Sequence, residues 1–347
     1  MKNTIKSIGR VALFLVILVV LLQITNKVFD PGYWFPSGWI QDRTARFAQL
    51  SLEEEGTLDV LNVGDSESLS AIIPMELWHD QGITSFNCGC DGMRLPECYT
   101  TLRTAFQKQK PKVVLLETGL LYRLDFDQDY QSLVAENIYY YFYGLRYHNM
   151  WKSFANQKGV RAYFKGYVVN NCIGVYEGPE DYMIETKEAD QVTTRNKRFF
   201  KAIMNLCERE GVEVVLYSVP APVNYNTYKH NGIQMLADEY GLKYIDFNMN
   251  WKEIGIDWSK DSQDRGDHLN RDGGIKLSTW LGNWLMDEFD LPDHRSDPEL
   301  AEQWDYLYDY CEYTSDVLKG TNTGNVTEEI REKLTVDGDF RQPGYDR

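Results

Sequence analysis

The chain has 347 residues, of which 43% are hydrophobic and 14% aromatic, so it can bury the core of one large domain with additional segments. This composition excludes an intrinsically disordered protein. The formal net charge is −16, and no cluster of Lys and Arg occurs after the first ten residues, which argues against a nucleic-acid partner. The acidic balance also disfavours a strongly anionic substrate, although a local basic patch is compatible with it.

The first segment has the pattern of a signal peptide or a signal anchor. Lys2, Lys6 and Arg10 precede an apolar run that extends without interruption from Val11 to Leu22. No small-x-small cleavage site follows this run, which favours a retained anchor. A buried helix of a soluble domain is the alternative, and three cations before a stretch without a polar face disfavour it.

The positive-inside rule places the N-terminus in the cytoplasm and the chain after about residue 30 outside, so we expect a single-pass protein of the cell membrane. The expected organisation is a cytoplasmic tail at 1–10, a transmembrane anchor at 11–25, a juxtamembrane segment at 26–56, a main domain at 57–290, and a C-terminal helix and tail at 291–347.

Strand-like and helix-like patterns alternate through the main domain. Short apolar runs predict strands at 58–64, 83–89, 112–119, 212–220 and 243–248. Amphipathic segments between them predict helices at 96–109, 194–211 and 231–241. Continuous apolar strands are typical of parallel sheets, so we expect an open α/β sheet with right-handed crossovers. A ligand would bind outside the carboxyl ends of its strands.

An aromatic-rich insertion at about 120–190 interrupts this alternation. Its Tyr and Trp side chains either lie over the carboxyl edge of the sheet, where they would suit sugar rings, or simply cover the core. The sequence leaves both interpretations open. About the last thirty residues are expected to be frayed.

Six cysteines leave the redox state open. Disulfides would be permitted outside the cell, but we interpret most of these residues as small, buried and apolar. A zinc site is disfavoured, because there is no second closely spaced pair and no histidine stands near these thiols. The residues are Cys88, Cys90, Cys98, Cys172, Cys207 and Cys311.

The stretch "LNVGDSESLS", residues 61–70, ends the first predicted strand. Gly64 permits a sharp turn, and Ser66 then falls in the first turn of the next helix, where free N–H groups and the helix dipole favour negative charge. Ser66 is therefore a candidate nucleophile, whereas Ser68 should point into the helix. The ordinary alternative is that Asp65 or Ser66 only caps this helix.

His268 stands in an acidic turn after the last predicted strand, beside Asp261, Asp264 and Asp267. A neutral imidazole needs a carboxylate on one nitrogen so that the other can accept a serine proton. Either Asp264 or Asp267 can orient the ring, depending on the turn. Metal binding by these acids is the competing interpretation; we predict no metal and no cofactor.

The motifs "NVGDSES" and "GDHLNRDG" resemble those of the SGNH or GDSL-like hydrolases over roughly residues 57–290. Within that superfamily the chain is most similar to membrane-anchored extracytoplasmic members, such as the D-alanyl transfer protein of lipoteichoic acid modification and the alginate O-acetylation proteins. The resemblance implies a flavodoxin-like three-layer sandwich with a mostly parallel five-stranded sheet. It further implies that Ser66 is the nucleophile, His268 the base, an Asp of the same block the third member, and the N–H groups of Ser66 and Gly89 the oxyanion hole.

Two positions depart from the family pattern. The family's Gly-x-Asn-Asp block is replaced by "LETGLLYR", so its oxyanion donor is missing or replaced, with Thr118 and Asn87 as candidates. Position 265 is Arg where an Asp-x-x-His block would have Asp. Both departures suit a transferase with a specialised acyl donor or a protein without activity better than they suit a fast hydrolase.

Two hypotheses follow. The first is an extracytoplasmic serine acyltransferase or esterase that acts on small acyl groups, acetyl or D-alanyl, of a cell-wall or exported polysaccharide, with a membrane-bound O-acyltransferase as a possible partner. The second is a catalytically inactive SGNH-like scaffold that binds polysaccharide in a membrane assembly complex.

Overall fold

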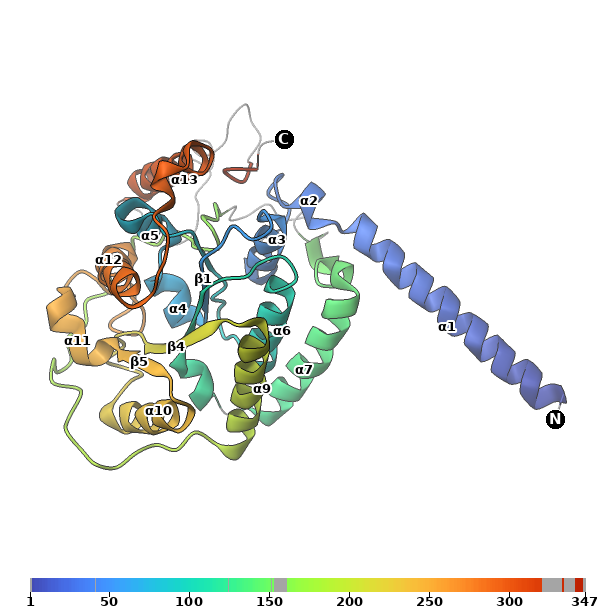
Figure 1. The fold of residues 1–347 in the computed structure, drawn as a ribbon, viewed down its shortest axis with the longest axis horizontal. Coiled ribbons are helices and arrows are strands. Elements are labelled where there is room, and N and C mark those ends of the chain that lie inside the picture. The colour runs from blue at the N-terminus through green and yellow to red at the C-terminus, as the bar shows by residue number, and fades with distance from the viewer. Residues whose placement is uncertain are drawn as a thin grey trace.

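The structure, a computed structural model, describes residues 2–40, 42–123, 125–150, 152, 161–319, 333 and 341–345. Five parallel strands form its central sheet in the order β2-β1-β3-β4-β5 (Figure 1). This order is that of flavodoxin-like folds, so the predicted sheet is confirmed. Every strand lies inside its predicted range: β1 at Val60–Val63, β2 at Ser85–Asn87, β3 at Val113–Glu117, β4 at Glu213–Ser218 and β5 at Lys243–Asp246.

Helices cover both faces of the sheet, because both faces are apolar. Along the strands, alternate side chains point to opposite faces. Leu61 and Leu116 pack in the core with side chains of α6 and α9, whereas their neighbours Val60 and Leu115 pack with side chains of α11 and α12. The helices on these faces are α3 (Ala45–Leu52), α4 (Ser66–Ala71), α5 (Pro74–Gln81), α6 (Leu95–Ala105), α9 (Thr194–Glu210), α10 (Thr227–Tyr240), α11 (Phe247–Ile254), α12 (Arg271–Glu288) and α13 (Pro298–Leu318).

Helix ends agree with the predictions at the two glycines and at the start of α9, Thr194, and differ at other ends. α9 and α10 end on Gly211 and Gly241, which take the left-handed conformation at φ 72° and 66°. α10 begins at Thr227 rather than at 231, because the Asn226 side chain accepts the Lys229 N–H at 3.0 Å and caps it. α6 ends at Ala105, four residues before the predicted end at 109.

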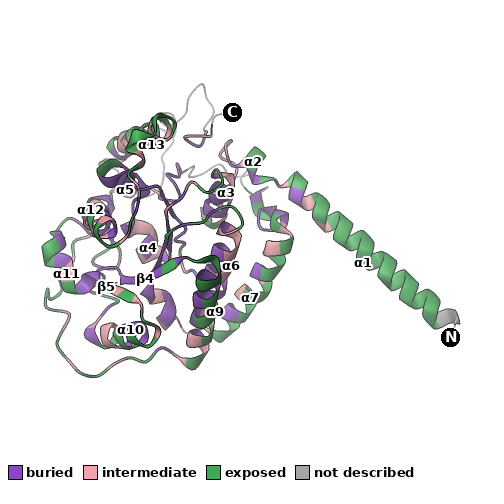
Figure 2. Cartoon of the chain, in the orientation of Figure 1, coloured by how far each residue is buried: buried purple, intermediate pink, exposed green. Residues whose placement is uncertain are grey.

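The N-terminal segment forms a single long helix, α1 (Lys2–Val28), followed by the short α2 (Pro31–Trp34). α1 leaves the domain (Figures 1 and 2), and its apolar part is exposed along its length. Its length and apolarity suffice to cross a membrane, and a signal sequence meets the same criteria.

The insertion contains α7 (Phe126–Tyr141) and two short 3-10 turns, η3 (Tyr143–Leu145) and η4 (His148–Met150). Its aromatic side chains divide between two environments. Tyr163 and Tyr167 are buried, whereas Tyr130 and Tyr141 on α7 are exposed. The interpretation that the aromatics cover the core therefore holds for part of them only.

All six cysteines are free, and five of them are buried, as the interpretation as small apolar residues requires. Most of the C-terminal tail predicted to be frayed lies outside the described residues. Residues 341–345 do pack: the Gln342 N–H donates to the Pro36 carbonyl at 2.9 Å, and its side chain is buried.

Candidate active site

The turn after β1 brings Ser66 to the carboxyl edge of the sheet. Asp65 caps α4, because its Oδ1 accepts the Glu67 N–H at 3.1 Å, and Ser66 is the first residue of that helix. A Cβ atom at Gly64 would lie only 2.4 Å from the Cβ of Glu117 at the end of β3. Glycine is thus required where β1 and β3 approach each other, which is also where the strand order reverses.

The loop before α12 holds His268 in a fixed position. A bridge between Ser262 and Leu269 closes this loop, and the Ser262 hydroxyl accepts the Gly266 N–H at 2.7 Å. Arg265 and Gly266 take positive φ values of 69° and 95°, which form the tight turn. Arg265 therefore serves as a turn residue.

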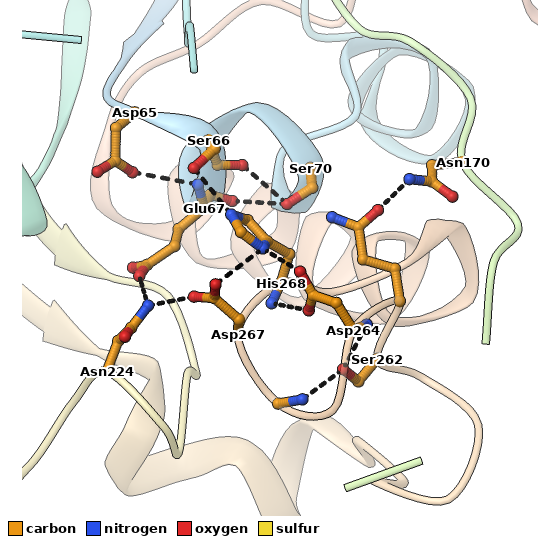
Figure 3. Close-up of polar contacts among 12 residues, drawn as sticks. Asp65, Ser66, Glu67, Ser70, Asn170, Asn224, Ser262, Asp264, Asp267 and His268 are labelled. Atoms are coloured by element: carbon orange, nitrogen blue, oxygen red, sulfur yellow. Dashed lines mark hydrogen bonds and ion pairs between the residues drawn. The ribbon is translucent and has the colours of Figure 1, made fainter. Parts of the chain in front are cut away.

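The two motifs meet at hydrogen-bond distance (Figure 3). His268 Nε2 lies 2.8 Å from Ser66 Oγ, and His268 Nδ1 lies 2.6 Å from Asp264 Oδ2. Asp264 Oδ1 also accepts the backbone N–H of His268 at 2.8 Å, so one carboxylate holds both the ring and the main chain. This is the arrangement of a nucleophile, a base and an orienting acid.

The structure distinguishes the acids that the sequence left open. Asp267 Oδ2 is 3.5 Å from His268 Nδ1, farther than Asp264, and its Oδ1 accepts from the Asn224 amide. Asp261 is fully buried and pairs with Lys276, so it holds the loop together. Asp264 is therefore the carboxylate that holds the His268 ring most closely.

A metal-binding cluster remains the competing interpretation of this turn, since oxygen and nitrogen atoms of Asp264, Asp267 and His268 lie within 4.8 Å of one another. Both ring nitrogens of His268 already have hydrogen-bond partners. A cation would have to displace Asp264 or Ser66 from the ring, so we interpret the cluster as a triad with an additional carboxylate.

The surrounding carboxylates determine the charge of the imidazole. Burial lowers the pKa of His268, but Asp264, Asp267 and Glu67 raise it by more, to about 9. Burial and the nearby Asp65 also raise the pKa of Glu67, to about 7. The resting site at neutral pH therefore contains a mostly protonated His268.

We expect the kcat/KM for a neutral activated ester to rise with pH and to level off above about pH 9, because only the neutral imidazole accepts the Ser66 proton. Asp267→Asn removes a carboxylate that raises the pKa of His268 and should shift this rising limb to lower pH. Initial rates across the pH range test both statements. A profile that is flat between about pH 6 and 9, or unmoved by Asp267→Asn, would contradict them.

The predicted oxyanion groups other than Ser66 have hydrogen-bond partners within the protein, so their part in an oxyanion hole stays a prediction. The Gly89 N–H donates to Asn87 Oδ1 at 2.8 Å. The Asn87 amide donates to the Ile72 carbonyl at 2.7 Å and is fully buried. Thr118 is buried too, and its hydroxyl lies 2.6 Å from the hydroxyl of Ser218.

The Asn87 side chain holds α4, because its Nδ2 also donates to the Ser68 and Leu69 carbonyls at 3.2 Å. Its Oδ1 also accepts from Asn62 Nδ2 at 2.9 Å. Asn87→Ala should therefore lower the free energy of unfolding by about 3 kcal/mol or more, because several buried polar groups lose their partners. Asn205→Ala, at an exposed position of α9, is the matched control and should change it by less than about 0.5 kcal/mol. Denaturant unfolding followed by tryptophan fluorescence measures both. Reduced turnover with unchanged stability in Asn87→Ala would support Asn87 as a direct participant.

A cavity of about 420 Å³ opens beside Ser66 and His268. Asn170, Asn171 and Arg46 also line it, and the sequence did not predict them. Arg46 is buried, and its Nε–H donates to the Gly166 carbonyl at 3.0 Å. Within the described part of the chain, no carboxylate lies in ion-pair range of its guanidinium. Arg46 is thus a local positive charge in an otherwise acidic protein.

Comparison with known proteins adds little to this geometry. No family model and no curated protein matches the chain. Among solved structures, a proposed acylhydrolase from Bacteroides fragilis is similar at 10% identity and a TM-score of 0.36, over 69% of this chain and 93% of that one. A GDSL-like lipase from Bacteroides thetaiotaomicron is similar at 12% identity and a TM-score of 0.37, over 72% and 98%. At these scores the likenesses support no conclusion about this chain, and its chemistry must be judged from its own side chains.

Proposed function

We propose that the protein is a serine esterase or O-acyltransferase that uses Ser66, His268 and Asp264. The observation that carries the proposal is the position of the His268 ring, between Ser66 Oγ at 2.8 Å and Asp264 Oδ2 at 2.6 Å. Such a ring takes the serine proton on one nitrogen while the carboxylate stabilises the imidazolium through the other.

In the proposed reaction, Ser66 Oγ attacks the carbonyl carbon of an acyl ester as His268 Nε2 takes its proton. The imidazolium then returns the proton to the departing alcohol, which leaves an acyl group on Ser66. Water or an acceptor hydroxyl attacks this acyl-enzyme by the same route. The Ser66 N–H, at the N-terminal end of α4, is a candidate donor for the developing oxyanion.

We infer that the acyl group is small, acetyl or D-alanyl, and that the other substrate is a cell-wall or exported polysaccharide. The cavity beside Ser66 is large enough for a sugar unit, and Arg46 would accommodate an anionic group on it. With α1 as a retained anchor of the cell membrane, the domain would work on the extracytoplasmic side, where a membrane-bound O-acyltransferase could supply acyl groups.

A non-catalytic scaffold that binds polysaccharide is the second candidate. It is favoured by the raised pKa of His268 and by the hydrogen bonds that Gly89 and Asn87, two of the expected donors, make within the protein. Covalent labelling by a fluorophosphonate separates the two candidates. An adduct on Ser66 supports the enzyme, and a protein that remains unlabelled at every concentration supports the scaffold.

A further inference from the structure

The outer face of α7 is exposed and mostly apolar, with Gln131 and Asn137 as exposed polar residues among the apolar ones. Exposed Phe126, Tyr130, Val134 and Ile138 follow one another at intervals of four residues, so they form a single stripe along the helix. Tyr141 continues the stripe at the C-terminal end and is 59% exposed.

The opposite, domain-facing side of α7 carries two of its three charged residues, and the third, Asp127, is exposed in the first turn. Asp129 and Glu136 are buried, and each pairs with arginine: Asp129 with Arg195 at 3.0 Å, and Glu136 with Arg146 at 2.5 Å. A helix on the surface of a water-soluble domain has the reverse arrangement, with apolar residues inside and charged residues outside. From Tyr130 to Tyr141 the outer face has no charged residue. This inversion indicates that the surroundings of α7 are apolar.

The end of α7 is fixed to the end of α1. η3 follows α7 directly, and the Gly144 N–H in η3 donates to Asn26 Oδ1 at 2.9 Å. A Cβ atom at Gly144 would lie 2.3 Å from the Thr25 carbonyl oxygen, so the two segments are in close contact. Figure 1 shows α7 on the side of the domain from which α1 leaves.

We propose that the stripe of Phe126, Tyr130, Val134, Ile138 and Tyr141 lies in the surface of the bilayer that α1 crosses. The proposal rests on α1 being a retained membrane anchor. Tyrosine and phenylalanine suit the interface between headgroups and acyl chains, and an amphipathic helix can lie there in the plane of the membrane. The stripe itself contains no Lys or Arg, and the nearby guanidiniums of Arg195 and Arg103 lie over its two end rings, Phe126 and Tyr141. We therefore expect a contact that is mainly apolar and does not require anionic lipid.

Nitroxide labels on the full-length protein test this contact. The chain is placed in phosphatidylcholine nanodiscs that contain no other protein, and Cys172→Ser removes the one cysteine that is not buried. Labels at Val134→Cys and Ile138→Cys probe the stripe. A label at Met249→Cys is the matched control, because Met249 is an exposed helical residue on α11, which lies across the domain from α1 (Figure 1).

We expect collisions with oxygen to exceed collisions with a water-soluble nickel chelate severalfold at residues 134 and 138, and the reverse at residue 249. Addition of anionic lipid should leave these ratios unchanged. Water-like ratios at 134 and 138 in protein that stays in the discs would overturn the α7 contact and leave the anchor intact. Loss of the protein from the discs would overturn the anchor and this inference with it, whereas fluorophosphonate labelling of Ser66 would be unaffected.

Discussion

Asp264→Asn should lower the kcat/KM for an activated ester by about 10⁴-fold, the loss that the same replacement of a triad aspartate causes in another triad. The amide keeps the size of the side chain but presents no negative charge to the imidazolium, and its NH₂ group can hold the ring in the wrong tautomer. Burial alone would raise the pKa of Asp264, but its hydrogen bonds from His268 keep that pKa below its usual range. Asp264 is therefore ionised when His268 becomes positively charged during the reaction.

Asp267→Asn is the matched control, because it removes the neighbouring carboxylate at 3.5 Å from the same ring nitrogen. It should cost less than about tenfold at high pH, where His268 is neutral in both proteins. Steady-state rates of the two variants at about pH 9.5 make the comparison. Equal losses would assign the two carboxylates a shared role, and a larger loss in Asp267→Asn would reverse the assignment.

Ser66→Ala should remove turnover almost completely, by about 10⁶-fold, because loss of the nucleophile leaves only binding and the remaining polarising groups. Ser70→Ala is the control on the same helix: its hydroxyl donates to the Ser66 carbonyl at 3.0 Å and lines the same cavity. That variant should keep most of the activity. Release of nitrophenol from an activated acetyl ester measures both, and a Ser66→Ala protein with undiminished turnover would exclude Ser66 as the nucleophile.

Much of the fold could be predicted because its determinants are local. The central strands β1, β3 and β4 are short, mostly apolar runs, and such runs are typical of the middle of an α/β sheet, whereas the edge strands β2 and β5 contain more polar residues. Ser66 and His268 could be predicted for a similar reason, because Ser66 follows the end of a strand and His268 precedes the start of a helix. The two residues are 202 positions apart in the sequence, so composition does not indicate that they meet. The resemblance of both motifs to one family predicted that they do.

The rest of the site depends on how distant segments pack. The choice between Asp264 and Asp267 required the left-handed turn at Arg265 and Gly266, which the sequence pattern did not predict. The role of Asn87 could not be decided, because a polar residue at a strand end has the same pattern whether it faces a substrate or supports a helix. Arg46 lies on α3, outside both motifs, and the packing of α3 on the insertion brings it to the cavity.

The inverted face of α7 could not be predicted for a comparable reason. Its sequence contains apolar residues and only three charged ones, Asp127, Asp129 and Glu136, and does not show which side faces the domain. Which side faces the domain depends on Arg146 and Arg195, which pair with the helix from elsewhere in the chain. A sequence pattern can predict where a helix lies, but it does not show whether the outer face of that helix contacts water or lipid.

The central claim is that Ser66 is a nucleophile activated by His268, and intact-mass analysis after fluorophosphonate treatment tests it most directly. We expect one adduct per full-length chain, mapped to the peptide that contains Ser66, formed faster at pH 9 than at pH 7 because of the raised pKa of His268. The adduct should be absent in Ser66→Ala and form much more slowly in His268→Ala. An adduct on another residue, or none in a folded protein at pH 9, would contradict the account.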